Sequence, residues 1–377
     1  METPFIFGDI AKNQQFIGYK DETEALVSSF VSSKNVVVTA ARKSGKTSLL
    51  EKAISKAQKT CPELRICRIS LANVRDEHLF FTLLAQQTIK ALCSTWEEAA
   101  SIVREYFSGM DVRMSMDTGR LSDMKLSFDR RDTSSLHEIF WRMPESLAGQ
   151  KKVKMTVIID DFNNILNFKV CDDIFEEMFS AWTEKGMVAY CLAGSHRALM
   201  LERFEAKAAA DAGFGNIISL GQINEGNLIE FIKAEFARTS KYIDDDAGKM
   251  IIRLAGSHPY YIQQLSQISW LRTYVVCTID IVNEAYEALL NQMDMVFGAL
   301  TDTLTDQQLC YVKAIVSGER IVSTADVLHR YGISSATSAS RSKTALLQRD
   351  IIDIHDGYPV IQDPIYSAWI KKRHFLI

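Results

Sequence analysis

The chain has 377 residues, more than one compact core usually holds, and this length predicts two or three domains. Its composition, with 47% hydrophobic and 24% charged residues, is that of an ordinary globular protein and excludes a disordered or fibrous chain. The formal net charge of −4 excludes a globally basic nucleic-acid-binding protein, so any such contact needs a local patch.

The seven cysteines are scattered and include no C-x-x-C pair, and the spacing of Cys61 and Cys67 is not that of a zinc finger. We therefore expect reduced thiols in a cytoplasmic protein. No apolar run approaches the ~18 residues of a membrane helix, and the first residues lack the basic and apolar regions of a secretory signal. These features predict neither membrane insertion nor secretion.

Residues 35 to 220 alternate short β-branched runs with helical patterns, which is typical of a parallel sheet with crossover helices. Helices are expected at residues 48–58 and 78–92. The pattern predicts an α/β, doubly wound parallel sheet. Its strands are expected at residues 35–39, 64–71, 153–159, 187–193 and 217–220.

Residues 111–128 interrupt this rhythm with alternating apolar and polar residues around the turn Asp117-Thr118-Gly119. This alternation predicts an inserted β-hairpin. The hairpin is either a contact arm or an edge hairpin packed on its own domain, and we favour the second interpretation.

After Gly221 the strand patterns stop, and four helical patterns predict an all-α domain. A third unit then shows three helical patterns followed by a hairpin around His355-Asp356-Gly357, which is the order of a winged helix. The expected domains are 1–222 for the sheet domain, 223–298 for a helical lid and 299–377 for the winged helix. The expected helices are 225–238, 244–254, 260–272, 279–295, 306–317, 323–330 and 335–349, and the hairpin strands are 351–354 and 358–361.

A phosphate-binding pattern follows the first strand. Residues 40–48 read Ala-Ala-Arg-Lys-Ser-Gly-Lys-Thr-Ser, close to the G-x-x-x-x-G-K-[ST] loop that joins a strand to a helix. Such a loop turns backbone N–H groups toward an anion, while its Lys reaches the outer phosphates and its hydroxyl binds Mg²⁺. Lys46 and Thr47 fill these two places, so we expect a purine nucleoside triphosphate, ATP with Mg²⁺. The expected nucleotide-binding residues are Ala41, Arg42, Lys43, Ser44, Gly45, Lys46, Thr47 and Ser48.

Polar residues follow two of the other strands. A triphosphate site needs a carboxylate at the end of a neighbouring strand to hold the metal, and the apolar run 156–159 ends in Asp160-Asp161. We expect Asp160 to bind the metal with Thr47, and Asp161 to polarise the attacking water. Ser195 follows the strand 187–193, where it would contact the γ-phosphate or that water.

With these parts in place, the chain resembles the archaeal-type ATPase family of the AAA+/STAND class over nearly its whole length. The family's loop, D-E pair and G-G-x-P stretch appear here as residues 40–50, Asp160-Asp161 and residues 255–261. The resemblance also covers Phe5-Ile6-Phe7-Gly8, residues 16–22 and the ending Tyr358 to Trp369.

The resemblance carries specific implications for binding residues. It implies that an N-terminal segment, residues 1–24, wraps the adenine, with Ile17 and Gly18 binding the nucleotide. It also implies that Pro259 packs near the nucleotide and that His258 senses phosphate. The family as a whole implies regulated, switch-like ATPases.

Four residues depart from the family pattern, among them Ala41, which stands where the family has Pro. Ala40 stands where the loop's first glycine belongs, and because alanine resists positive φ we expect an altered loop entry. Asp161 is one methylene shorter than the family's Glu, so slow turnover is expected. Tyr19 replaces an Arg.

The predicted winged helix has two candidate partners. Residues 335–349 carry Arg341 and Lys343 and no acid, and these two cations are candidate DNA contacts. Residues 302–377, however, contain nine Lys and Arg against eight Asp and Glu, which is not a basic domain. We therefore expect a protein partner ahead of DNA.

The sequence thus predicts a Mg²⁺-dependent ATPase that cycles between ATP and ADP and whose nucleotide state positions a winged helix. The alternative is a nucleotide-stabilised scaffold with negligible hydrolysis. A small-molecule kinase is disfavoured because the second acid, Asp161, suits water activation. The oligomeric state is left open, a homo-oligomer included.

Overall fold

The computed structural model describes residues 3–10, 15–131, 137–168, 170–183, 186–208 and 213–377. Parts of the predicted N-terminal segment, residues 1–2 and 11–14, lie outside the described residues. Contacts divide the chain into two units. The sheet unit comprises Lys20–Ala40 and Leu49–Leu220, and the helical unit comprises Met1–Tyr19, Ala41–Ser48 and Gly221–Ile377. The phosphate loop, residues 41–48, therefore groups with the helical unit. The three predicted domain boundaries stay predictions.

The sheet unit is built on five parallel strands in the order β2-β5-β6-β1-β7. The expected parallel sheet is confirmed, with ends that shift by one or two residues. One expectation was wrong: β6 lies between β1 and β5, so the strand that ends in Asp160 is not the immediate neighbour of β1. The strands are β1 (Val36–Thr39), β2 (Arg65–Ser70), β5 (Met155–Asp160), β6 (Val188–Gly194) and β7 (Asn216–Ser219).

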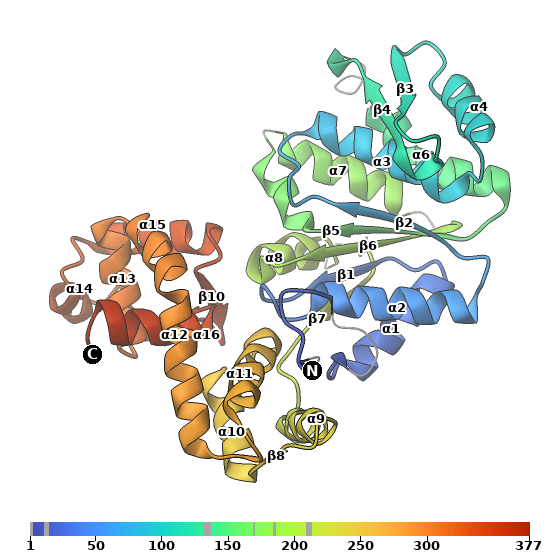
Figure 1. Cartoon of the computed structure of the whole chain (residues 1–377). Helices are drawn as coiled ribbons and strands as arrows, with labels where there is room; N and C mark the ends of the chain where they lie inside the picture. Colours follow the sequence, from blue (N-terminus) through green and yellow to red (C-terminus); the bar gives the residue numbers. More distant parts are fainter. Residues whose placement is uncertain (1–2, 11–14, 132–136, 169, 184–185, 209–212) are drawn as a thin grey trace. The chain divides into compact units, whose positions relative to one another are not determined.

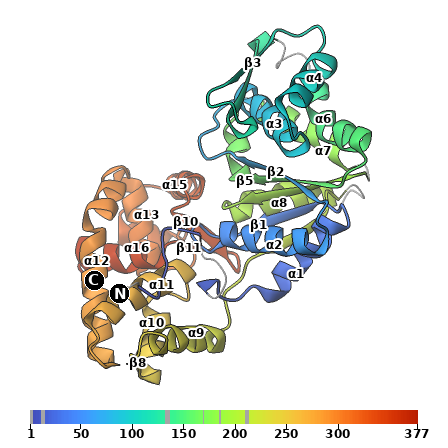
Figure 2. The same cartoon turned by 45° about the vertical axis from the view of Figure 1, so that its right-hand side comes forward.

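Helices cover both faces of this sheet, as a doubly wound fold requires (Figures 1 and 2). One face carries α1 (Lys20–Val31) and α2 (Lys46–Thr60), and the other carries α3 (Glu77–Leu92), α6 (His137–Lys151) and α7 (Cys171–Trp182). Aromatic side chains fill the second layer. There Trp182 stacks on Tyr190 of β6, with ring centroids 4.0 Å apart. The sheet and this helix layer thus share one hydrophobic core, which holds the strands and their ends in place. Helix α8 (Arg197–Ala208) follows β6.

The inserted hairpin consists of β3 (Val112–Met116) and β4 (Met124–Phe128), which pair antiparallel. It lies on the outer side of the helix layer, next to α3 and α4 (Trp96–Tyr106) (Figure 1). The alternate residues Met124, Leu126 and Phe128 are buried, and the side chain of Gln86 in α3 accepts a hydrogen bond from Leu126 N at 3.1 Å. These contacts support the packed edge hairpin rather than a free contact arm.

The longest stretch of the helical unit, Gly221–Ile377, begins with four helices. They are α9 (Glu225–Ala237), α10 (Asp245–Leu254), α11 (Pro259–Arg272) and α12 (Ile279–Asp302). Two differences from the sequence prediction stand out. The two-residue strands β8 (Tyr242–Ile243) and β9 (Val276–Cys277) pair in parallel, so this part is not purely helical. In addition, α12 continues past the expected end at residue 295 and through the predicted boundary at 298–299.

The C-terminal part shows three helices and a hairpin, in the order that the sequence predicts for a winged helix. They are α13 (Asp306–Val316), α14 (Ala325–Tyr331), α15 (Ala336–Gln348), β10 (Ile352–His355) and β11 (Tyr358–Ile361), followed by α16 (Pro364–Trp369) and a π-turn at Ile370–His374. Helix α16 packs on the second half of α12, where Trp369 Nε1 donates to Asp294 Oδ1 at 2.5 Å. The rings of Tyr366 and Phe297 pack there with centroids 5.2 Å apart. The C-terminal part is therefore anchored on α12.

No helix among the described stretches of chain is both long enough and apolar enough to span a bilayer.

Candidate functional site

The phosphate loop connects the end of β1 at Thr39 to the start of α2 at Lys46. Lys43 has φ +59° and Gly45 has φ +92°, and this left-handed backbone turns successive N–H groups toward one point. The side chain of Ser44 is buried, and its Oγ has no hydrogen-bond partner among the described residues. Lys46 and Thr47 open the helix. A concave run of donors at a helix N-terminus suits a phosphate anion, so the residues present fit the predicted ligand.

The backbone of Ala40 overturns one expectation. Ala40 is not among the described residues with positive φ; it is fully buried, and its N–H donates to Gly194 O at 3.2 Å. The positions that need a left-handed backbone are Lys43 and Gly45 instead. Alanine at position 40 therefore imposes no φ strain, and the expected alteration of the loop entry was wrong.

This geometry predicts that Ala40→Gly improves neither the stability of the protein nor its affinity for ATP. Glycine adds chain entropy to the unfolded state and removes a buried methyl group, so we expect the free energy of unfolding to fall by about 0.5–1 kcal/mol. Urea denaturation measures this loss, and titration with Mg-ATP should give an unchanged affinity. A clearly tighter affinity for ATP in Ala40→Gly would contradict this account of the loop entry.

A cavity within the helical unit joins the phosphate loop to an aromatic wall. Ile17 and Pro259, both predicted to bind the nucleotide, line this cavity. Gly18 does not line it. A Cβ on Gly18, where φ is +70°, would lie 2.7 Å from Ile223 Cγ2, so close packing explains this glycine. The lining residues are Ile6, Phe7, Gly8, Asp9, Gln15, Phe16, Ile17, Tyr19, Lys43, Ser44, Gly45, Ser48, Pro259, Tyr260 and Gln263.

His258 precedes α11 and lies against the phosphate loop rather than in the cavity lining. Its Nε2 is 2.8 Å from Arg42 O, and burial lowers the pKa of the imidazole, so the ring is neutral near pH 7. Because a carbonyl can only accept, the proton of the neutral ring lies on Nε2, which donates to the carbonyl of Arg42. The Nδ1 atom is buried and has no hydrogen-bond partner among the described residues. His258 therefore holds the backbone of the loop, and its contact with phosphate stays a prediction.

The side chains of the loop reach two other elements of the helical unit. Arg42 Nε donates to Asp350 Oδ2 at 2.6 Å, and Asp350 lies between α15 and β10 with φ +54°. The ammonium of Lys43 lies over the ring of Tyr260 in α11, 4.5 Å from its centroid. Tyr261, the next residue, donates from its hydroxyl to the Asp363 carboxylate at the start of α16. The phosphate loop thus contacts both α11 and the C-terminal part.

In the sheet unit, the acids occupy the end of β5. The side chain of Asp160 is largely buried, and its Oδ1 accepts a hydrogen bond from Asp161 N at 3.0 Å. Asp161 has φ +56°, a left-handed conformation that Asp and Asn adopt more readily than most residues. The hydroxyl of Ser70, at the end of β2, is 3.4 Å from Asp161 Oδ2. The two carboxylates therefore have different hydrogen-bond partners, and their roles toward a metal and a water stay predictions.

Ser195 is held by a residue that the sequence analysis missed. Asn163, in the turn after β5, is 5% exposed, and its Oδ1 accepts from Ser195 N at 3.0 Å and lies 3.4 Å from Ser195 Oγ. Gly194 pairs with Thr39 of β1, so β1, β5 and β6 end at the same edge of the sheet. The structure therefore brings Asp160, Asp161 and Ser195 to one edge. No sequence pattern marks Asn163, because its partner is 32 residues away.

The two candidate DNA contacts lie on α15. Arg341 is exposed and Lys343 is half-buried. Arg349, which follows the helix, donates to Thr303 O at 3.2 Å and so contacts the end of α12. Of the predicted pair, Arg341 is therefore the exposed cation on the surface of α15.

Comparisons with known proteins address the fold. No protein-family model and no curated protein sequence matches the chain. A solved Walker-type ATPase of Pyrococcus abyssi matches with a TM-score of 0.67 at 12% identity, over 98% of this chain and 100% of the other. The Aeropyrum pernix ORC2 protein, solved with ADPNP and ADP, matches with a TM-score of 0.57 at 11% identity, over 97% and 96%.

A third match is the Aeropyrum pernix ORC1 protein, solved in complex with DNA. Its TM-score is 0.52 at 10% identity, over 100% of this chain and 99% of that one. All three identities are low, so the likeness concerns the fold. The strand order and the two-sided helix cover agree with it. The chain therefore has the fold of these solved proteins, the P-loop AAA+-like fold that the sequence predicts.

Proposed function

We propose that this protein is an ATP-binding switch of the STAND type that hydrolyses ATP slowly and whose nucleotide state positions its C-terminal part. The AAA+ fold and the fit of the phosphate loop to an anion support nucleotide binding. The cavity adds a second argument, because it combines loop residues such as Ser44 with aromatic walls such as Phe7 and Tyr260. A ligand with an anionic and a planar aromatic part suits this combination, and the ORC2 match was solved with two such ligands.

The metal of the proposed reaction would be Mg²⁺, held by the hydroxyl of Thr47 and the carboxylate of Asp160. Oxygen donors of this kind suit Mg²⁺, which takes few protein ligands when phosphates supply the others. The ion would neutralise charge on the phosphates. Lys46 would stabilise the outer phosphates, Asp161 would polarise the attacking water, and Ser195 would contact that water or the γ-phosphate.

The main observation that supports the proposed switch is a pair of contacts made by Arg42. Its carbonyl accepts a hydrogen bond from His258 before α11, and its guanidinium pairs with Asp350 after α15. The side chain of Asp350 is 4% exposed, whereas that of Arg42 is 64% exposed. A buried carboxylate depends on its cationic partner more than an exposed guanidinium does. A movement of the loop on phosphate binding would therefore alter the ion pair between Arg42 and Asp350.

The partner of the C-terminal part is proposed to be a protein or DNA. Exposed Arg341 on α15 supports phosphate contact, and the ORC1 match was solved with DNA. Half-buried Lys343 and the nearly balanced charge of residues 302–377 support a protein instead.

Hydrogen exchange of the amides at 349–353 tests the switch. We expect these amides to exchange at different rates with Mg-ATP and with Mg-ADP, because the γ-phosphate changes the position of Arg42. Asp350→Asn should abolish this difference while ATP binding persists. Asp356→Asn is the matched control, since it removes the same charge from a carboxylate that is 91% exposed on the neighbouring hairpin. Equal exchange in both nucleotide states of the unaltered protein would refute the switch and favour the scaffold.

A further inference from the structure

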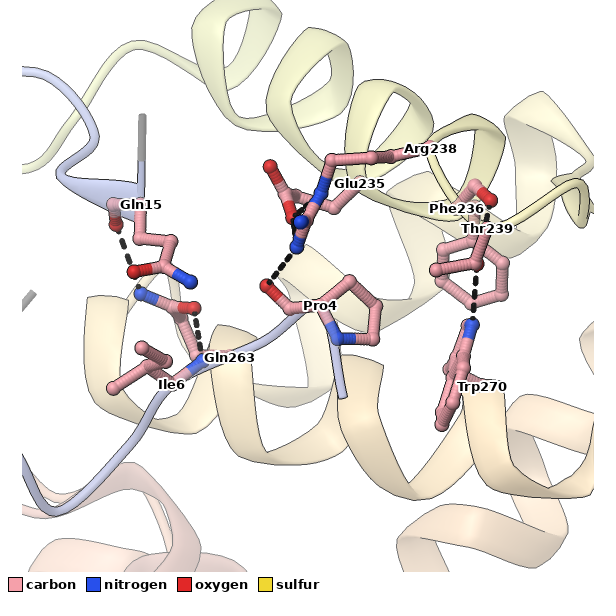
Figure 3. Close-up of polar contacts among 9 residues, drawn as sticks. All are labelled: Pro4, Ile6, Gln15, Glu235, Phe236, Arg238, Thr239, Gln263 and Trp270. Carbon is pink, nitrogen blue, oxygen red and sulfur yellow. Dashed lines mark hydrogen bonds and ion pairs between the residues drawn. The ribbon is translucent and has the colours of Figure 1, made fainter. Parts of the chain in front are cut away.

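Two described parts of the N-terminal segment, residues 3–10 and 15–19, contact α11, and a single side chain of α11 holds both. Gln263 of α11 accepts a hydrogen bond from Ile6 N at its Oε1, 2.9 Å away. Its Nε2 donates to Gln15 O at 3.1 Å. Figure 3 shows the amide of Gln263 between these two parts of the segment. One amide group thus joins a donor and an acceptor that are nine residues apart in sequence.

Gln263 is also part of the cavity wall. The side chain is 5% exposed, and it lines the same cavity as Ile6 and Gln15. The segment supplies most of the apolar wall of this cavity, including Phe7 and Phe16. The phosphate-loop residues line the cavity from a separate part of the chain. The wall suited to a base and the loop suited to phosphates are therefore built from different segments.

A second set of contacts holds the start of the segment. Arg238, directly after α9, donates from Nη2 to Pro4 O at 3.3 Å and to Glu235 Oε2 of α9 at 2.9 Å (Figure 3). Phe5 is buried against Phe236, with ring centroids 5.6 Å apart. These contacts bind the segment to α9 and leave Gln263 to hold the part that faces the cavity.

We propose that Gln263 is a positioning residue for the base of a purine nucleotide, acting through the N-terminal segment and not on the phosphates. This proposal rests on the proposed nucleotide site. The Gln263 amide satisfies Ile6 N–H and Gln15 C=O together because it carries both an acceptor and a donor. Without it, these two part-buried backbone groups lose their partners and the wall of the cavity loosens.

The test compares ATP with inorganic tripolyphosphate, which carries the phosphates but no base. In Gln263→Met, which keeps the length and removes both hydrogen bonds, we expect the affinity for ATP and ADP to fall about tenfold. The affinity for tripolyphosphate should be unchanged, and the preference for ATP over GTP should shrink. Calorimetric titration of the full chain measures all four ligands, and thermal unfolding confirms that the variant is folded.

Gln264→Met is the matched control. Gln264 is the next residue of α11, is 7% exposed, and its Oε1 has no hydrogen-bond partner within the described chain. Its substitution should leave every affinity unchanged. A parallel loss of ATP and tripolyphosphate in Gln263→Met, or no loss of either, would overturn the inference. If the unaltered protein binds tripolyphosphate and does not bind ATP more tightly, the proposed nucleotide function itself fails.

Discussion

Lys46→Ala should lower the affinity for Mg-ATP by about 10- to 150-fold while the protein stays folded. Lys46 is the first residue of α2, directly after the left-handed Gly45, where its ammonium can reach the outer phosphates of a ligand in the loop. A hydrogen bond to a charged group contributes about 1.5–3 kcal/mol, and 1.4 kcal/mol corresponds to a tenfold change in affinity. Calorimetric titration gives the affinity directly.

Lys59→Ala provides the comparison for this substitution. Lys59 is an exposed lysine in the last turn of the same helix, so its replacement removes the same charge from the same element. It should leave the affinity for ATP intact. Equal affinities in Lys46→Ala and the unaltered protein would remove the phosphate loop from the binding site and with it the proposed function.

Asp161→Asn should reduce phosphate release by about 10²- to 10⁴-fold, the usual contribution of a general base, with little change in ATP affinity. Asparagine is the suitable substitution because it tolerates the left-handed backbone at φ +56° and keeps the size of the side chain. It removes only the negative charge and the proton acceptor. Single-turnover assays with labelled ATP measure the chemical step apart from product release.

Asp160→Asn separates the proposed role of Asp161 as a base from the proposed role of Asp160 as a metal ligand. It should weaken binding of Mg-ATP and leave binding of ATP in chelator unchanged, because the proposed role of Asp160 is to hold Mg²⁺. If the unaltered protein releases phosphate no faster than Asp161→Asn does, the scaffold alternative holds and Asp161 is not a base.

Much of the sheet unit follows from its sequence because local and global requirements agree there. The runs at β1, β5 and β6 are buried on every residue, and such continuous, mostly apolar stretches predict a strand at the centre of a parallel sheet. Their order does not follow from the runs. Placing β6 between β1 and β5 depends on pairing between distant segments, and no local signal encodes it.

The site residues divide in the same way. Two short motifs could be recognised in the sequence, one at the start of α2 and one at the end of β5. They contain Lys46, Thr47, Asp160 and Asp161. Asn163 and Gln263 lie in no motif, because each acts on backbone groups that are distant in sequence. The role of Ala40 was misjudged because the pattern shows which residue is usual and not the φ that it adopts.

The length of α12 has a mechanical consequence. This uninterrupted helix has 24 residues and, at 1.5 Å per residue, is about 36 Å long. It packs beside α11 and carries α16 on its second half, where Asp294 and Phe297 contact Trp369 and Tyr366. It contains no proline and no break, so a rigid tilt would be transmitted along its whole length. A tilt of about 10° at its first turn would move its last turn by roughly 6 Å, which would turn a small rearrangement near α11 into a large displacement of the C-terminal helices.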